Sequence, residues 1–332
     1  MHIVKNLFPN DQANSLNKTL TAQAAGFLAH NLALKHDEQL LVITIPEMLT
    51  IEAAIWLAAA RQFTTNVQLI CLQGMHHSGE EPPAEVVAAA TQAGVTIMQT
   101  MFSLTHTQAG KQALVGGGRA LSLPGADLAL ISMALQTDYE VLRTLGLAVE
   151  QKLKAGKQIH ITSDQGTDLT ATIRQSGVEA ETGFLRPGEI GNLPSGEVFF
   201  APVLKTANGT LVIDGAIADD VLDAPITIEI RDGRATKFSG GLAAQNLGNK
   251  LKQFGKKGLI VAEIGIGTNK DAKISDNLLE TEKAFGTVHV AFGNSSAIGG
   301  ENNVAIHIDG LVSQPTVWVD GGMILQNKRF TT

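Results

Sequence analysis

The chain has 332 residues, of which 44% are hydrophobic and 17% are charged. This length exceeds one typical folding unit, so we expect two lobes with sizeable cores and not a disordered chain. Lysine and arginine number 25 against 32 aspartates and glutamates, a net charge of −7 without a basic block, which argues against a nucleic-acid partner. The single cysteine, Cys71, excludes disulfides within the chain and cysteine-rich metal sites.

The amino-terminal segment, residues 1–12, lacks the apolar run and the small-residue cleavage site of a signal peptide. The longest apolar stretches, such as residues 40–45 and 55–60, are too short to cross a bilayer. We therefore expect a soluble, cytoplasmic protein without a membrane partner.

Residues 1–155 alternate strand-like and helical patterns, which is typical of a parallel α/β sheet. Strands are predicted at residues 40–46, 67–73 and 95–100, and helices at 51–63 and 83–94. A glycine turn at 116–118 precedes another short strand. The sequence thus predicts an N-terminal α/β lobe.

Residues 156–332 read as a β-rich lobe of mixed or antiparallel strands, so the predicted fold class is α/β plus α+β. The stretch 157–173 reads as two strands joined by a turn, and the hairpin at 226–240 contains a clear RDGR turn. Further strands are predicted at 209–217, 287–293, 303–312 and 316–325. Helices are expected only near 242–255 and 276–285.

The second lobe places acids and histidines where metal binding would need them. His307 and Asp309 share one face of a predicted strand, because residues i and i+2 point the same way. A polar surface strand would show the same short pattern. His289 lies opposite an apolar face, Glu263 ends an apolar strand, and Glu197 follows a Pro-Ser-Gly turn. Taken together, three carboxylates and two imidazoles suit two divalent ions such as Zn, Mn or Co.

Several strings in the same lobe carry a resemblance to a known family. PSGEVFFAP, GTLVIDG, AEIGIGTN, EKAFGTVHVAFG, IGGENN and HIDGLV occur in the order found in the M29 aminopeptidases, the aminopeptidase T family. The resemblance covers most of residues 160–325 and extends more weakly into the first lobe through SLTHT and GGGRALSLP. It implies a two-metal exopeptidase and a homodimer that encloses a cavity for small peptides or small molecules. By position, its metal ligands fall on Glu197, Glu263, His289, His307 and Asp309.

Two features depart from the peptidases. The position of the family's catalytic tyrosine, seven residues after His289, is Ser296, and the one tyrosine of the chain is Tyr139. The segment between His289 and His307 is also short. Both features resemble a sister group, the iron-dependent 2,5-dihydroxypyridine dioxygenases, which keep the HxD pair, replace the acid of the AEIGIG string with a histidine and lack the other peptidase ligands. This sequence keeps Glu263 and Glu197, so its ligand set resembles that of the peptidases.

The main hypothesis is therefore a metallo-aminopeptidase that releases N-terminal amino acids by means of water activated by two metal ions. Glu263 or Glu197 would be the general base, and Ser296 would have to replace the tyrosine at the oxyanion. The alternative is a ring-cleaving dioxygenase that holds one Fe(II) through His289, His307 and Asp309. A scaffold protein with a structural metal is a third possibility. His106, which follows a predicted strand of the first lobe, is a candidate cleft residue or an ordinary loop histidine.

Overall fold

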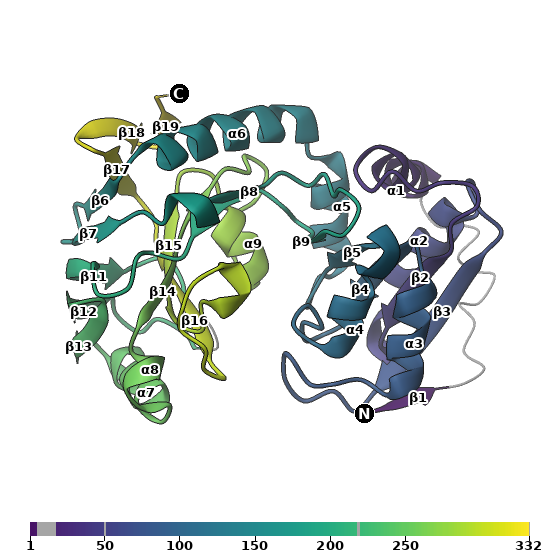
Figure 1. The fold of residues 1–332 in the computed structure, drawn as a ribbon, viewed down its shortest axis with the longest axis horizontal. Helices are drawn as coiled ribbons and strands as arrows, with labels where there is room; N and C mark the ends of the chain where they lie inside the picture. The colour runs from purple at the N-terminus through teal and green to yellow at the C-terminus, as the bar shows by residue number, and fades with distance from the viewer. Residues whose placement is uncertain (5–17, 50, 218–219, 332) are drawn as a thin grey trace. The chain divides into compact units, whose positions relative to one another are not determined.

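The computed structural model describes residues 1–4, 18–49, 51–217 and 220–331 (Figure 1). The chain forms two compact units, one of Met1–Tyr139 with Gly183–Ser195 and one of Glu140–Thr182 with Gly196–Thr332. The division falls before the expected boundary at residue 155. The reason is helix α6 (Tyr139–Ala155), whose buried Val149 and Leu153 belong to the core of the second unit.

The first unit is built on a six-stranded sheet in the order β1-β3-β2-β4-β5-β9. All neighbouring strands are parallel except the β1–β3 pair. The strands are β1 (His2–Val4), β2 (Leu40–Thr44), β3 (Val67–Gln73), β4 (Val95–Gln99), β5 (Arg119–Ser122) and β9 (Ile190–Asn192). The helices are α1 (Lys18–His30), α2 (Glu52–Ala60), α3 (Ala84–Gln92), α4 (Gln108–Gln112) and α5 (Leu128–Gln136). Strand β9 comes from the returning segment, so the sheet is completed by residues distant in sequence.

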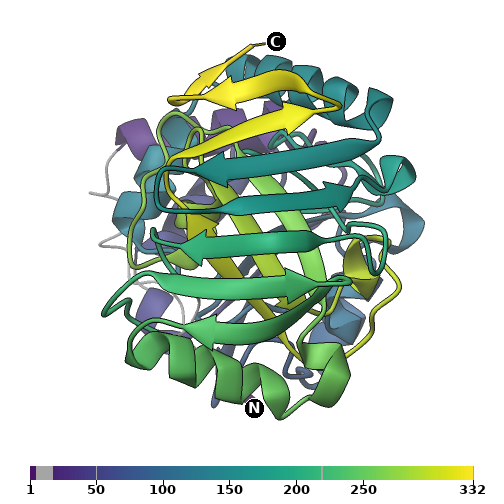
Figure 2. The same cartoon turned by 90° about the vertical axis from the view of Figure 1, so that its left-hand side faces the viewer.

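The second unit contains two antiparallel sheets, of five and eight strands. The five-stranded sheet has the order β16-β15-β14-β10-β8 and consists of β8 (Glu179–Glu181), β10 (Glu197–Phe200), β14 (Val261–Gly267), β15 (Val288–Gly293) and β16 (His307–Val312). The eight-stranded sheet consists of β6 (Gln158–Ser163), β7 (Asp168–Thr172), β11 (Asn208–Ile213), β12 (Ile226–Arg231), β13 (Arg234–Ser239), β17 (Pro315–Val319), β18 (Gly322–Gln326) and β19 (Arg329–Phe330). Figure 2 shows this larger sheet towards the viewer, with strands of the smaller sheet crossing behind it. The helices are α7 (Leu242–Lys252), α8 (Gly255–Gly258) and α9 (Leu278–Lys283), in addition to α6.

The core of the second unit lies between these sheets and determines which side chains face away from it. Alternate residues of a strand point to opposite faces. Phe200, Ile264, Val290 and Ile308 of the smaller sheet are buried in one cluster with residues of the larger sheet. Their neighbours along each strand therefore project from the other face of the smaller sheet.

The expected fold class is confirmed, since one unit has a largely parallel α/β sheet and the other is β-rich and antiparallel. The helices predicted near 242–255 and 276–285 correspond to α7 and α9. Across the described residues, no helix combines the length and the apolar character needed to cross a membrane.

Candidate metal centre

The five predicted ligands come together on the five-stranded sheet, on the face that is turned away from the core. They are contributed by four adjacent strands, namely Glu197 by β10, Glu263 by β14, His289 by β15, and His307 with Asp309 by β16. The backbone register explains the grouping, because Ala291 on β15 pairs with Glu263 on one side and with Asp309 on the other. The i, i+2 alternation read from the sequence therefore places these side chains on one surface.

A glycine beneath the histidine ring makes the grouping possible. Gly265 on β14 pairs with His289 on β15, and a Cβ atom at position 265 would lie 2.1 Å from both Cε1 and Nε2 of the imidazole. No side chain other than hydrogen fits at that distance. Gly265 thus allows the ring to lie across β14, between the two glutamates.

A bulge in β14 turns Glu263 towards the ligand face. Val261 pairs with Phe292 and Glu263 pairs with Ala291, so β14 has one residue more than β15 in this interval. The extra residue reverses the alternation. Val261 consequently faces the core while Glu263 joins the ligands.

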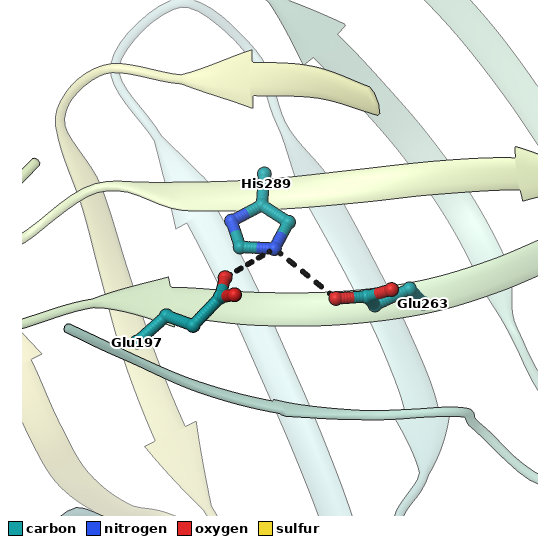
Figure 3. A group of neighbouring side chains, drawn as sticks. All are labelled: Glu197, Glu263 and His289. Carbon is teal, nitrogen blue, oxygen red and sulfur yellow. Dashed lines mark hydrogen bonds and ion pairs between the residues drawn. The ribbon is translucent and has the colours of Figure 1, made fainter. Parts of the chain in front are cut away.

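His289 is the central residue of the group shown in Figure 3. Its Nε2 lies 3.1 Å from Oε2 of Glu197 and 3.4 Å from Oε1 of Glu263. All three side chains are buried, and each offers a ligand atom within 4.8 Å of the other two. These three residues could hold a metal ion.

His307 and Asp309 extend the group towards solvent. Nε2 of His307 lies 3.5 Å from Oε2 of Glu263 and 3.3 Å from Oδ2 of Asp309. Nδ1 of the same ring lies 2.8 Å from the carbonyl oxygen of Asn294, to which it can donate a hydrogen bond. A donated Nδ1–H leaves Nε2 as the nitrogen that can bind a metal. Glu263 therefore lies between the Nε2 atoms of both imidazoles.

A buried lysine occupies the opposite side of Glu197. Lys283, the last residue of α9, has a side chain that is 1% exposed, and its ammonium donates to Oε1 of Glu197. The same ammonium lies 3.4 Å from Glu181 and 3.6 Å from Glu282. Glu197 thus contacts a cation through one oxygen and His289 through the other.

Opposite charges hold most of these groups ionised. Burial would raise the pKa of Glu197, but Lys283 and His289 outweigh it and lower that pKa to about 2. Burial likewise opposes the shift in Asp309, where His307 lowers the pKa to about 2.

The cations shift in the other direction. Burial would lower the pKa of His307, but Asp309 and Glu263 raise it to about 10. Burial is outweighed similarly at Lys283 and His289, whose pKa values are raised by the surrounding glutamates. Without a metal ion, the histidines therefore carry protons at neutral pH.

The group has the donors and the spacing that a divalent ion requires. Atoms that bind one ion at about 2.1 Å lie roughly 3.0–3.4 Å from one another. The contacts among Glu263, His307 and Asp309 measure 3.3 and 3.5 Å, close to that spacing. In addition, Oε2 of Glu197 is buried and faces Nε2 of His289 at 3.1 Å, so a metal ion bound by that nitrogen would have a carboxylate oxygen beside it. Imidazole and carboxylate ligands together suit iron, manganese, cobalt or zinc.

Three other residues singled out from the sequence have different surroundings. Ser296 is exposed at a short 3-10 turn, where its hydroxyl donates to Oδ1 of Asn294 at 2.8 Å. His106 lies in the first unit, in an exposed turn before α4. Tyr139 also belongs to the first unit, where its buried hydroxyl donates to the carbonyl oxygen of Ala134 at 2.8 Å. Tyr139 therefore has a packing role and does not replace the missing tyrosine.

Sequence reasoning missed Glu181. Glu181 is directly opposite Glu197 in the β8–β10 pair. Strand β8 has three residues, Glu179–Glu181, and its EAE sequence has no apolar alternation. Only the pairing of β8 with β10 shows that this acid lies beside the ligands.

The Gly265→Ala variant tests the role of the close contact. We expect the added methyl group to displace the His289 ring, to lower metal affinity at least about tenfold, and to cost about 1–3 kcal/mol of stability. Isothermal titration with Mn²⁺ and urea unfolding measure the two effects. Gly146→Ala is the matched control, because a Cβ there finds its nearest neighbour at 3.6 Å. Equal metal affinity in the two variants would contradict the role assigned to Gly265.

Comparisons with known proteins identify relatives of the chain. The family model for 2,5-dihydroxypyridine 5,6-dioxygenase matches residues 28–332. A 2,5-dihydroxypyridine 5,6-dioxygenase from Pseudomonas putida strain KT2440 is 29% identical over 237 residues, which make up 66% of this chain and 66% of the relative. The sequence match thus spans just under two thirds of that relative.

Two solved structures share the fold. The 2,5-dihydroxypyridine dioxygenase of Pseudomonas putida KT2440 has a TM-score of 0.81 at 20% identity, with 94% of this chain and 97% of that chain covered. Wild-type AmpT from Thermus thermophilus has a TM-score of 0.67 at 15% identity, with 94% and 99% covered. These likenesses concern the fold alone, and the second one supports the aminopeptidase-like fold implied by the M29 resemblance.

The expectation of a hydrolase, specifically a metallo-aminopeptidase or protease, is wrong. The hydrolase was predicted mainly from carboxylate and imidazole ligands, which hydrolases and oxygenases both use. The serine at position 296, where the peptidases have a tyrosine, received less weight. The family match runs through the whole ligand-bearing unit and names a dioxygenase. The chain belongs to the 2,5-dihydroxypyridine 5,6-dioxygenase family.

Proposed function

We propose that the protein is an iron(II)-dependent dioxygenase that opens the ring of a small dihydroxypyridine-like molecule. The observation that carries the proposal is the convergence of two imidazoles on shared carboxylates in a family of dioxygenases. Glu263 lies 3.4 Å from Nε2 of His289 and 3.5 Å from Nε2 of His307, and Asp309 lies 3.3 Å from the latter nitrogen. Two imidazoles and one carboxylate form the ligand set of many non-haem Fe(II) oxygenases.

In this proposal His289, His307 and Asp309 hold the ion. The bound Fe(II) would supply the one-electron chemistry that dioxygen needs before it can react with an aromatic ring. The carbonyl oxygen of Asn294 keeps the His307 ring oriented through Nδ1. Three protein ligands leave positions open for small molecules.

Glu263 is then the remaining carboxylate beside both imidazoles. A hydroxylated pyridine reacts more readily with an oxidant after it has lost a proton. One oxygen of Glu263 lies 3.4 Å from Nε2 of His289 and the other lies 3.5 Å from Nε2 of His307, so the carboxylate is close enough to a ring bound beside these nitrogens to accept that proton. We assign Glu263 as the general base.

Oxygen uptake tests the activity itself. The protein is loaded with Fe(II) under anaerobic conditions, mixed with 2,5-dihydroxypyridine, and followed with an oxygen electrode and by loss of ring absorbance. We expect consumption of one O₂ per substrate and no hydrolysis of aminoacyl anilides. A fully iron-loaded protein that consumes no oxygen with dihydroxylated pyridines would overturn the proposal.

Two matched variants separate the base from the ligand. Glu263→Gln should keep most of its iron and lose about 10²–10⁴-fold in kcat, because general-base catalysis is removed. Asp309→Asn should lose most of its iron under the same conditions. Iron content and turnover measured on the same samples decide the roles, and iron loss in the first variant with retention in the second would reverse them.

Metal binding should release protons. The pKa values of His289 and His307 are raised in the metal-free protein, the latter to about 10, so both rings are protonated at pH 7. An ion binds only the deprotonated nitrogen, so its apparent affinity should rise as the pH rises towards 10. Calorimetry at pH 7 in buffers of different ionisation enthalpy should report about two protons released per ion. A binding enthalpy that is independent of the buffer would contradict this expectation.

A further inference from the structure

The ammonium of Lys283 is buried among carboxylates. It contacts Glu197, Glu181 and Glu282, and its side chain is 1% exposed. A buried lysine is stable only where negative charges compensate for the loss of water. The carboxylate that accepts its hydrogen bond is Glu197, one of the five ligands that the sequence predicted for two metal ions.

The strand pairing explains why a cation is needed at this position. Glu181 and Glu197 stand directly opposite each other on β8 and β10. Two carboxylates in such a pair repel each other, and more strongly when both are shielded from water. A cation between them removes the repulsion, and either an ammonium or a divalent ion can serve.

The two kinds of cation compete for the same oxygens. Oε1 of Glu197 accepts from Lys283, while Oε2 of the same carboxylate lies 3.1 Å from Nε2 of His289. An ion on the Lys283 side of Glu197 would meet the positive ammonium and would have to displace it. An ion on the His289 side meets only groups that can give up a proton.

We infer that the Lys283 ammonium takes the place of a second divalent cation and restricts this centre to one metal ion. The inference rests on the metal site of the proposed function, but not on the reaction assigned to it. Lys283 is thus a positioning residue that selects a centre with one ion over a centre with two. One ion with open positions suits oxygen chemistry, whereas water activation by two ions suits hydrolysis.

Metal stoichiometry tests the inference. Metal-free wild-type protein and Lys283→Met are titrated with Mn²⁺, and bound ions are counted by calorimetry and by metal analysis after desalting. We expect one ion per chain in the wild type and two in the variant, with exchange-coupled Mn²⁺ signals in its electron paramagnetic resonance spectrum. Lys283→Met with Glu197→Gln should return to one ion. Lys237→Met is the control for the lost charge, because Lys237 pairs with Glu229 at an exposed position.

Two results would overturn the inference. One is a wild-type protein that binds two ions per chain, whatever its activity. The other is a Lys283→Met protein with native near-UV circular dichroism that still binds one ion. If the loss of the cation prevents folding, the double variant Glu181→Gln with Lys283→Met removes one of the opposing carboxylates. Two bound ions per chain in that protein would support the inference, and one bound ion would contradict it. A wild type that binds one ion but consumes no oxygen would refute the proposed activity and leave the inference intact.

Discussion

Compensation of buried negative charge is the constraint on which the site depends. Five acids converge on the outer face of the smaller sheet and around its edge, namely Glu181, Glu197, Glu263, Glu282 and Asp309. Carboxylates removed from water are costly unless cations accompany them. Lys283 and the two histidines supply three positive charges, and burial beside Asp309 raises the pKa of Glu282 to about 8, so this acid keeps its proton at neutral pH. With Glu282 neutral, four carboxylates face three cations, and a divalent ion that displaces the two histidine protons leaves this charge unchanged, because it adds two positive charges and removes two.

The part of this arrangement that could be predicted follows from local geometry. Strand alternation placed His307 and Asp309 on one face, and the same rule placed His289 opposite its apolar neighbours. Glu263 was found as an acid at the end of an apolar strand. The bulge that turns it towards the ligands could not be predicted, because the apolar and polar residues of the strand do not reveal an extra residue in its pairing. Here the sequence was informative because each ligand lies on a strand whose hydrophobic residues identify the core.

The remainder depended on pairing between distant segments. Glu181 belongs to a strand of three residues with no apolar face, and only its register with β10 places it beside Glu197. The division of the chain at Tyr139 and the return of β9 to the first sheet are also long-range effects. The sequence pattern of a helix such as α6 does not show which core the helix packs against. Local patterns therefore could not locate the boundary between the two units. The contact of Glu197 with both Lys283 and His289 could not be predicted either, because it too depends on packing between distant segments.

Local patterns show the ligands but not the residues around them, and for this reason the same set of ligands was compatible with both hydrolysis and oxygenation. Carboxylates and imidazoles identify a divalent metal, but hydrolases and oxygenases use the same residue types. What separates the reactions is how many ions the acids can share and which groups line the open positions. Ser296 stands where the M29 resemblance implies a catalytic tyrosine, and Lys283 contacts Glu197, the acid that a second ion would need in our inference. On these proposals the reaction depends less on the ligands themselves than on the residues that limit the number of ions and the groups beside them.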